Sequence, residues 1–203
     1  MEDYSKILED LNRRWFKGHF CKTQEEAKAL ALEIIGNDSV GFGGSITVSD
    51  LGIYDALLEK GNEMHWHWKV GTKEEKRTER ETSLFADIYL ASANALTRDG
   101  RVLNIDGTGN RVASLAFGPK RVLLIVGKNK LVDSIDEGIE RTRRDCCPKN
   151  ARRQNLKTPC SVTDKCTDCS SPDRMCNIFT VTEYAPKGFR EYHIILVDED
   201  LGR

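Results

Sequence analysis

The stretch Arg121-Val122-Leu123-Leu124-Ile125-Val126 decides the fold of this chain. Its five consecutive apolar residues have the length of one strand, and such runs fit a strand that is buried on both faces, as in a parallel sheet. A final strand is expected over residues 191–197, and strand-like segments alternate with helical ones before it. This alternation predicts an α/β domain with a mostly parallel sheet.

The other expected elements are found by working outward from that strand. Apolar residues at helical spacing predict a helix over residues 4–17, and Thr23 followed by Glu26 has the capping-box form that begins a second helix. Further helices are expected at 46–58, 72–85, 111–117 and 131–144, and further strands at 39–42, 64–68, 87–91 and 101–105. Helical or strand periodicity is lost over residues 145–177.

The composition excludes several classes of protein. With 31 basic and 32 acidic residues among 203, the net charge of -1 argues against a globally basic nucleic-acid binder and against an acidic solvating tail. No stretch approaches the roughly 20 apolar residues that a membrane helix needs. The start Met-Glu-Asp-Tyr-Ser-Lys lacks the features of a signal peptide. We therefore expect a cytoplasmic protein without a membrane partner, whose seven cysteines are reduced.

Two glycine-rich turns are expected where a strand ends and a helix begins. They are Gly41-Phe42-Gly43-Gly44-Ser45 and Asp106-Gly107-Thr108-Gly109-Asn110-Arg111. Glycine lets the backbone approach a ligand, a helix N-terminus offers N–H groups to an anion, and ligands of parallel sheets bind at the carboxyl ends of strands. Each turn also has a structural explanation, as a tight turn without a ligand or as an Asp or Asn helix cap. Neither is a Walker loop or a Rossmann fingerprint, so no NAD or flavin motif is present.

The cysteines are concentrated in Cys160-x5-Cys166-x2-Cys169-x6-Cys176. Four cysteines in a polar stretch are hard to explain as core packing, whereas four thiolates suit zinc or an iron–sulfur cluster. A bound metal would also hold a long irregular segment in place. Free thiols, or a redox disulfide between Cys166 and Cys169, are the alternatives.

Two weaker signals complete the candidates. His65 and His67 alternate along an expected strand, so both imidazoles could face one ligand, although a half-exposed strand with aromatic residues on its other face is the simpler explanation. Residues 141–157 hold seven basic side chains and one acid, Asp145. They could bind phosphate, an anionic cofactor or RNA, although a solvated helix face is simpler and no aromatic residues interleave with the charges as RNA binding favours.

Several blocks of the chain resemble the lactate-utilisation (LUD) domain family. They are Ala93–Val112, Phe117-Gly118-Pro119 and Val126-Gly127-Lys128-Asn129-Lys130, while residues 40–50 are similar to the family's earlier glycine-rich loop. The stretch Thr163–Cys176 is similar to a subgroup with a cysteine-rich C-terminal segment. The resemblance covers nearly the whole chain. It implies a three-layer α/β sandwich like that of the sugar-phosphate isomerase and CoA-transferase superfamily.

The resemblance also implies a domain plan and a ligand site. Residues 1–203 would form one domain, with the helices of residues 1–36 and the cysteine-rich loop 145–177 as additions. Ligands of the relatives lie over the glycine-rich strand ends. The matching positions here are Gly43, Gly44, Ser45, Asn94, Asp106, Gly107, Thr108, Gly109 and Asn110. The metal ligands would be Cys160, Cys166, Cys169 and Cys176, with an iron–sulfur cluster favoured over zinc.

Family members are linked to the oxidation of L-lactate to pyruvate together with iron–sulfur partner proteins. We therefore expect a subunit or accessory protein in the oxidation of lactate or a related 2-hydroxy acid, with a small anionic or CoA- or nucleotide-like ligand. The sequence is compatible with an oligomer and identifies no catalytic residue. The alternatives are a non-catalytic or regulatory module that binds a nucleotide, CoA or a sugar phosphate, and an RNA-associated protein.

Overall fold

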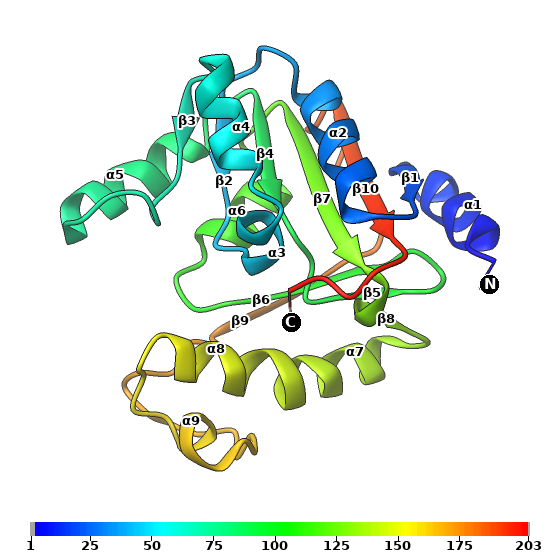
Figure 1. Cartoon of the computed structure of the whole chain (residues 1–203). Coiled ribbons are helices and arrows are strands. Elements are labelled where there is room, and N and C mark those ends of the chain that lie inside the picture. Colours follow the sequence, from blue (N-terminus) through cyan, green and yellow to red (C-terminus); the bar gives the residue numbers. More distant parts are fainter. Residues whose placement is uncertain (1–2, 203) are drawn as a thin grey trace.

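The computed structural model describes residues 3–202 of the chain. Within them, six strands form a wholly parallel sheet in the order β1-β10-β7-β4-β2-β3 (Figure 1). In that order the strands span Lys17–Cys21, Glu191–Val197, Arg121–Gly127, Ile88–Ala91, Val40–Phe42 and Met64–His65. The prediction of a mostly parallel sheet is confirmed.

Strand β7 is the fold's central strand and is buried on both faces, as its uninterrupted apolar sequence predicts. Residues Val122–Val126 have no exposed surface. Leu123 and Ile125 pack into the hydrophobic core on one face of the sheet, and Leu124 and Val126 pack into the core on the other. The division follows from the alternation of side chains along a strand. One sheet therefore separates two cores.

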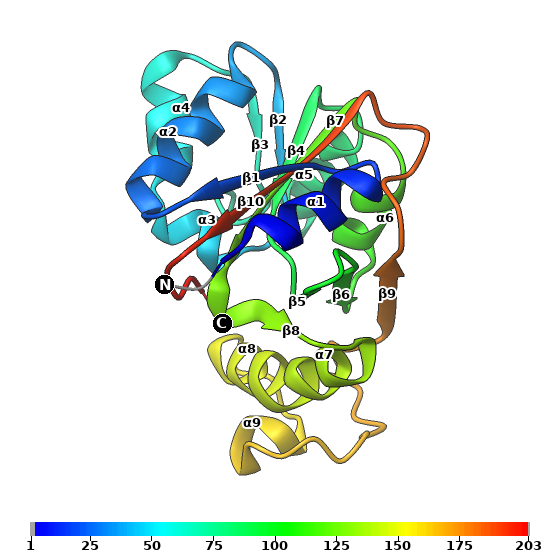
Figure 2. The same ribbon diagram turned by 90° about the vertical axis from the view of Figure 1, so that its right-hand side faces the viewer.

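Helices cover both faces of this sheet (Figure 2). On one face, α2 (Gln24–Ile35), α3 (Ile46–Asp50) and α4 (Ile53–Lys60) contribute buried apolar side chains to the first core. On the other, α1 (Ser5–Arg13) and α6 (Asn110–Ala116) pack into the second core. The predicted three-layer α/β sandwich is confirmed.

A second, smaller sheet of mixed direction joins the layer of α1 and α6. Within residues 3–202 its order is β8-β5-β6-β9. These strands span Leu131–Val132, Ala95–Thr97, Val102–Asp106 and Ile178–Thr182, and the β5–β6 and β6–β9 pairs are antiparallel. The sequence predicted β6 and gave no clear signal for the other three.

The segment after β8 differs most from expectation. The helix predicted over residues 131–144 begins at Ile135, because Leu131 and Val132 pair with β5. Helix α7 (Ile135–Arg141) then continues through a π-helical turn, Thr142–Cys146, into α8 (Cys147–Arg153). A short helix, α9 (Pro159–Thr163), follows. Part of the region 145–177 is thus helical, and it lies beyond the second sheet (Figure 1).

Smaller differences also have local causes. The strand expected over 64–68 ends at His65, and the helix expected over 46–58 breaks at Gly52, whose φ of +60° is left-handed. Helix α5 (Lys73–Ser83) begins as expected, with Thr72 and Glu75 forming a capping box. Among the described residues, no helix combines the length and the apolar character needed to cross a membrane.

Candidate functional site

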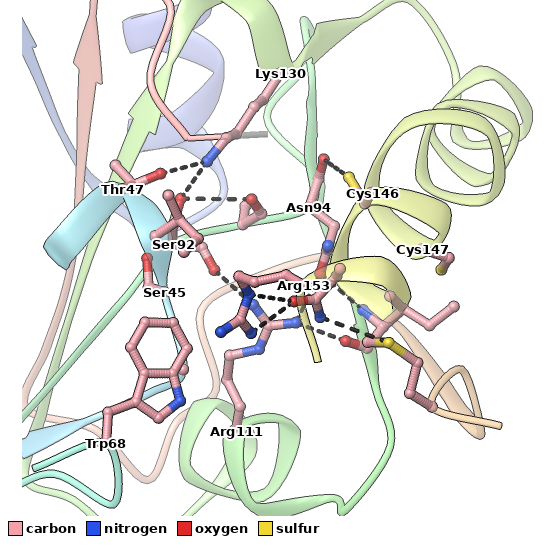
Figure 3. A pocket seen from close by; sticks show the side chains of 16 residues that line it. Ser45, Thr47, Trp68, Ser92, Asn94, Arg111, Lys130, Cys146, Cys147 and Arg153 are labelled. Atoms are coloured by element: carbon pink, nitrogen blue, oxygen red, sulfur yellow. Dashed lines mark hydrogen bonds between the residues drawn. The ribbon is translucent and has the colours of Figure 1, made fainter. Parts of the chain in front are cut away.

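Two adjoining cavities lie where β2, β4 and β7 end, beside α8, and Figure 3 shows the lining of the inner one. The polar and thiol lining of the inner cavity comprises Ser45, Thr47, Trp68, Ser92, Asn94, Arg111, Lys130, Cys146, Cys147, Asn150 and Arg153. The polar and aromatic lining of the outer cavity comprises His67, Trp68, Arg80, Asp106, Thr108, Asn110, Arg111, Asn150, Arg153 and Gln154. Residues of both glycine-rich turns therefore line one continuous site.

Lys130 is a buried cation at the back of the inner cavity. Its side chain follows the end of β7, the residue is 2% exposed, and its Nζ donates hydrogen bonds to Thr47 Oγ1 (2.7 Å) and Ser92 Oγ (2.8 Å). Burial lowers the pKa of Lys130 to about 7, because the charged form loses water. No acidic side chain among the described residues forms an ion pair with it. A buried ammonium with only neutral partners can accept an anion as its counterion.

Arg111 brings a second cation to the same space from helix α6. Its guanidinium donates to Asn94 Oδ1 (2.8 Å) and to the carbonyl oxygen of Ile105 (2.6 Å). Asn94 Oδ1 also accepts from the backbone N–H of Ile105 (3.0 Å), so the amide is held firmly. These acceptors are neutral, and within residues 3–202 no carboxylate pairs with Arg111. The guanidinium is thus fixed in place with its charge uncompensated.

Trp68 lines both cavities and is the outermost ring of an aromatic stack. Trp68 stacks on Trp66, with ring centroids 5.4 Å apart, and Trp66 stacks on Phe42 at 5.0 Å. The guanidinium carbon of Arg153 lies 4.8 Å from the centre of the Trp68 ring. Arg153 also donates to Asn150 Oδ1 (2.7 Å). The stack and α8 therefore hold a third basic group at the site.

His67 is the titratable side chain deepest in the wall of the outer cavity. The residue is 8% exposed, and its Nδ1 is buried without a hydrogen-bond partner in the described structure. Burial lowers the pKa of His67 to about 4, and the Arg80 cation acts in the same direction. The imidazole is therefore neutral near pH 7. His65 instead approaches Glu63 (3.2 Å) and Glu79 (3.5 Å), so the two imidazoles do not converge on one ligand.

Asp106 stabilises the second glycine-rich turn. Its Oδ1 accepts from the backbone N–H groups of Thr108 (3.0 Å) and Gly109 (2.9 Å), and its Oδ2 accepts from those of Arg111 (3.0 Å) and Val112 (3.2 Å). The carboxylate lines the outer cavity, but both of its oxygens are engaged. The capping explanation of this turn accounts for Asp106.

The nine predicted ligand positions are distributed unevenly. Gly44, Ser45 and Asn94 line the inner cavity; Gly44, Asp106, Gly107, Thr108 and Asn110 line the outer one; Gly43 and Gly109 line neither.

Close protein contacts explain two of the glycines. A Cβ on Gly43 would lie 3.0 Å from Ala91 Cβ, and a Cβ on Gly107 would lie 2.8 Å from the carbonyl oxygen of Met175. At both positions, contact with the protein itself is enough to require glycine.

Lys130 and Arg80 are the cations of the site that were not predicted, whereas Arg111 stands in a predicted glycine-rich turn and Arg153 in the predicted basic segment. Lys130 stands in a block that carries the family resemblance, directly after the buried strand, and its place there was the available signal. Arg153 belongs to the basic segment 141–157, which is only in part a solvated face, since Arg141 is 6% exposed and donates to the carbonyl oxygen of Asn94 (2.6 Å). Nothing in the local sequence marks Arg80 or Ser92.

The cysteines do not gather into a metal site as the described residues are arranged. Within residues 3–202, no group of three or more His, Cys, Asp or Glu side chains is placed to hold a metal ion. Within residues 3–202 no disulfide joins any of the cysteines; Cys166 is exposed, while Cys160, Cys169 and Cys176 are partly buried. The metal site at these four cysteines therefore stays a prediction that this geometry does not support. The two buried thiols of the region, Cys146 and Cys147, line the inner cavity instead.

Comparisons with known proteins agree with the fold. The family model of the LUD domain matches residues 4–197. No curated protein matches the chain. A solved structure of a DUF162 family protein from Deinococcus radiodurans is similar at 13% identity, over 97% of this chain and 99% of that chain, with a TM-score of 0.51. Ribose 5-phosphate isomerase A from Neisseria gonorrhoeae matches over 56% of each chain, at 16% identity and a TM-score of 0.33. At these identities the likeness to the DUF162 protein concerns the fold alone.

Proposed function

Since this chain belongs to the LUD domain family, which is associated with lactate utilisation, we propose that its inner cavity binds the carboxylate of lactate or a related 2-hydroxy acid. The protein then serves as a subunit or accessory protein in the oxidation of that acid. The observation that carries the proposal is Lys130, a buried ammonium group that reaches the cavity with two hydroxyl partners and no ion pair among the described residues.

The inner cavity offers the groups that a small hydroxy acid needs. Lys130 and Arg111 supply positive charge for a carboxylate, and a bound carboxylate would favour the protonated form of the lysine. Ser45, Thr47 and Ser92 line the same cavity. The hydroxyls of Ser45 and Thr47 can donate to the 2-hydroxyl group of the ligand, whereas that of Ser92 already donates to the carbonyl oxygen of Ile125. The residues of this chain thus bind and orient the acid.

The two electrons removed from a 2-hydroxy acid need an acceptor. The chain has no flavin or nicotinamide fingerprint, so we propose that an iron–sulfur partner protein supplies the acceptor. A metal centre at Cys160, Cys166, Cys169 and Cys176 would be an alternative source. Iron, acid-labile sulfide and zinc measured on anaerobically purified protein distinguish the two.

Calorimetry with the full chain and L-lactate or pyruvate tests the carboxylate site. Lys130→Met keeps the length of the side chain and removes its charge, and we expect it to weaken binding by about 10- to 100-fold, the usual value of a charged hydrogen bond. Lys128→Met is the matched control, because Lys128 pairs with Asp198 at the surface and does not line the cavity. Absence of binding by the unaltered protein, or equal affinities of Lys130→Met and wild type, rejects the proposal.

The alternative of a phosphate-bearing ligand, such as a nucleotide, CoA or a sugar phosphate, is favoured by one specific observation. This observation is the basic character of the outer cavity, whose lining includes Arg80, Arg111 and Arg153.

A further inference from the structure

We infer that the outer cavity is a phosphate subsite, distinct from the carboxylate site around Lys130. Three guanidinium groups line it, those of Arg80, Arg111 and Arg153, together with the neutral imidazole of His67. Among the described residues that line it, Asp106 is the acidic one. Arginine is the residue that most often recognises phosphate, because its planar fork matches two phosphate oxygens.

The charge of Asp106 does not neutralise these cations through a direct contact. Its two oxygens accept four backbone N–H groups, and it forms no ion pair with Arg80 or Arg111 in the described structure. The remaining charge of the cavity lining is therefore positive. A tetrahedral anion would restore the balance.

Two side chains of the lining have hydrogen-bonding atoms that are buried and unused. His67 is 8% exposed, and its Nδ1 has no partner; the Nε of Arg80 is likewise buried and without one in the part of the chain that the structure describes. Buried polar groups in proteins are nearly always paired, since leaving one unpaired costs free energy. Since both residues line the cavity, a rotation of the imidazole or of the guanidinium group towards a phosphate oxygen would give these atoms a partner.

The local elements hold these groups in position. Helix α5 carries Arg80, and its first turn is closed by the capping box of Thr72 and Glu75. His67 lies between the stacked indoles of Trp66 and Trp68 in sequence, and its ring is edge-on to Trp68 at 6.2 Å. The capping box and the indoles thus hold the backbone that carries Arg80 and His67.

The two cavities share Gly44, Trp68, Arg111 and Arg153 in their linings. If the proposed function holds, one ligand can span both, with its carboxylate at Lys130 and its phosphate group at Arg80. A 2-hydroxy acid that carries a phosphate ester, such as 3-phosphoglycerate, has this chemistry. A separate phosphate-bearing ligand beside the hydroxy acid has the same chemistry at the outer cavity.

The test is a titration of the full chain with inorganic phosphate, followed by ³¹P NMR and calorimetry. We expect phosphate to bind, and Arg80→Gln to weaken its binding about 10- to 100-fold, as the loss of charged hydrogen bonds does. Arg77→Gln is the matched control, because Arg77 stands one turn earlier on α5 and pairs with Glu81 at the surface. Arg80→Lys keeps the positive charge but loses the planar guanidinium group. We expect its affinity for phosphate to lie between those of wild type and Arg80→Gln.

Three outcomes are decisive. If wild type binds no phosphate, or if Arg80→Gln binds it as wild type does, the subsite is rejected. If 3-phosphoglycerate binds far more tightly than phosphate and loses affinity in both Arg80→Gln and Lys130→Met, the subsite is supported and one ligand spans both cavities. If phosphate binding depends on Arg80 but 3-phosphoglycerate gains nothing, the subsite is supported and belongs to a separate ligand. Because the phosphate arm contains no hydroxy acid, it stands even where lactate fails to bind.

Discussion

At the scale of single residues, Lys130 links the stability of the fold to its site. Burial of the ammonium group between Thr47 and Ser92 lowers its pKa from 10.5 to about 7. The unfolded chain therefore takes up this proton at a higher pH than the folded one, and stability is lost as pH falls from 10.5 towards 7. At neutral pH, burial of Lys130 therefore lowers the free energy of unfolding of the unliganded protein.

We expect Lys130→Met to stabilise the unliganded protein at pH 7 by about 1–2 kcal/mol, because it removes a buried charged group that serves the site and not the fold. Urea unfolding at pH 7 measures the difference, which should shrink as pH rises towards 10.5. Lys128→Met, which removes only a surface ion pair with Asp198, should change stability by less than about 0.5 kcal/mol. A less stable Lys130→Met at pH 7 contradicts the interpretation.

Asp106 has the opposite role, since its removal should destabilise the fold. Asp106→Ala leaves four backbone N–H groups without their acceptor, and we expect a loss of about 2–4 kcal/mol, because unsatisfied buried donors each cost about 1–3 kcal/mol and some of these will reach water. Chemical denaturation measures it. Asp133→Ala, which removes the exposed partner of Arg98, is the control and should have little effect.

At the scale of elements, the second glycine-rich turn and the cysteine-rich segment are joined by a close contact. A Cβ on Gly107 would lie 2.8 Å from the backbone oxygen of Met175, which cannot move away by rotating a side chain. Gly107→Ala should therefore destabilise the protein by about 1–3 kcal/mol, as overpacking does, and expose the stretch around Met175 to protease. Gly71→Ala is the control, since its Cβ would come no closer than 3.8 Å to another group. Equal melting and cleavage of the two variants contradicts the prediction.

The elements that could be predicted are those with a strong local signal. Strand β7 is a continuous apolar run, and α5 has a capping box and helix-favouring residues. Strands β8 and β9 have no such signal, because they are short or half-exposed and depend on pairing with β5 and β6. The π-helical turn at Thr142–Cys146 breaks the spacing of 3.6 residues that marks a helix, so the continuity of α7 with α8 is invisible to periodicity.

At the scale of the whole molecule, the site is assembled by strand order rather than by local sequence. The sheet brings the ends of β2, β4 and β7 together, and with them Thr47, Ser92 and Lys130, which are distant in sequence. The alternation of strands and helices predicted that both glycine-rich turns follow parallel strands. The first turn does follow β2, whereas the second follows β6, an antiparallel strand of the smaller sheet. The order of the strands, and therefore the partners of Lys130, depends on packing that spacing does not encode.

The response of the whole fold to acid should begin with its buried histidines. His19 Nε2 lies 3.0 Å from His193 Nδ1 across the β1–β10 pair, and burial is the main cause that lowers the pKa of both and of His67. Their folded pKa values lie below the unfolded value of 6.5, so their contribution to stability is present above pH 6.5 and is lost as pH falls below it. Protonation of one ring of the pair also places a positive charge beside Lys17, which lowers the pKa of His19 further.

Two carboxylates should add a second stage at lower pH. Hydrogen bonds from Lys120 and Lys17 hold the pKa values of Asp87 and Glu191, respectively, at about 2, below the unfolded values of 3.8 and 4.5, so their stabilising effect is lost between about pH 4.5 and 2. We therefore expect the melting temperature to fall in two steps, from pH 6.5 and again from pH 4.5. Replacing both His19 and His193 by Gln should reduce the first step to the share of His67, because Gln has no proton to gain in this range. The second step should persist through Asp87 and become smaller at Glu191, which loses the hydrogen bond from His193. Melting curves from pH 8 to 3 test this, and a melting temperature that is constant down to pH 5 in the unaltered protein removes the histidines from the explanation.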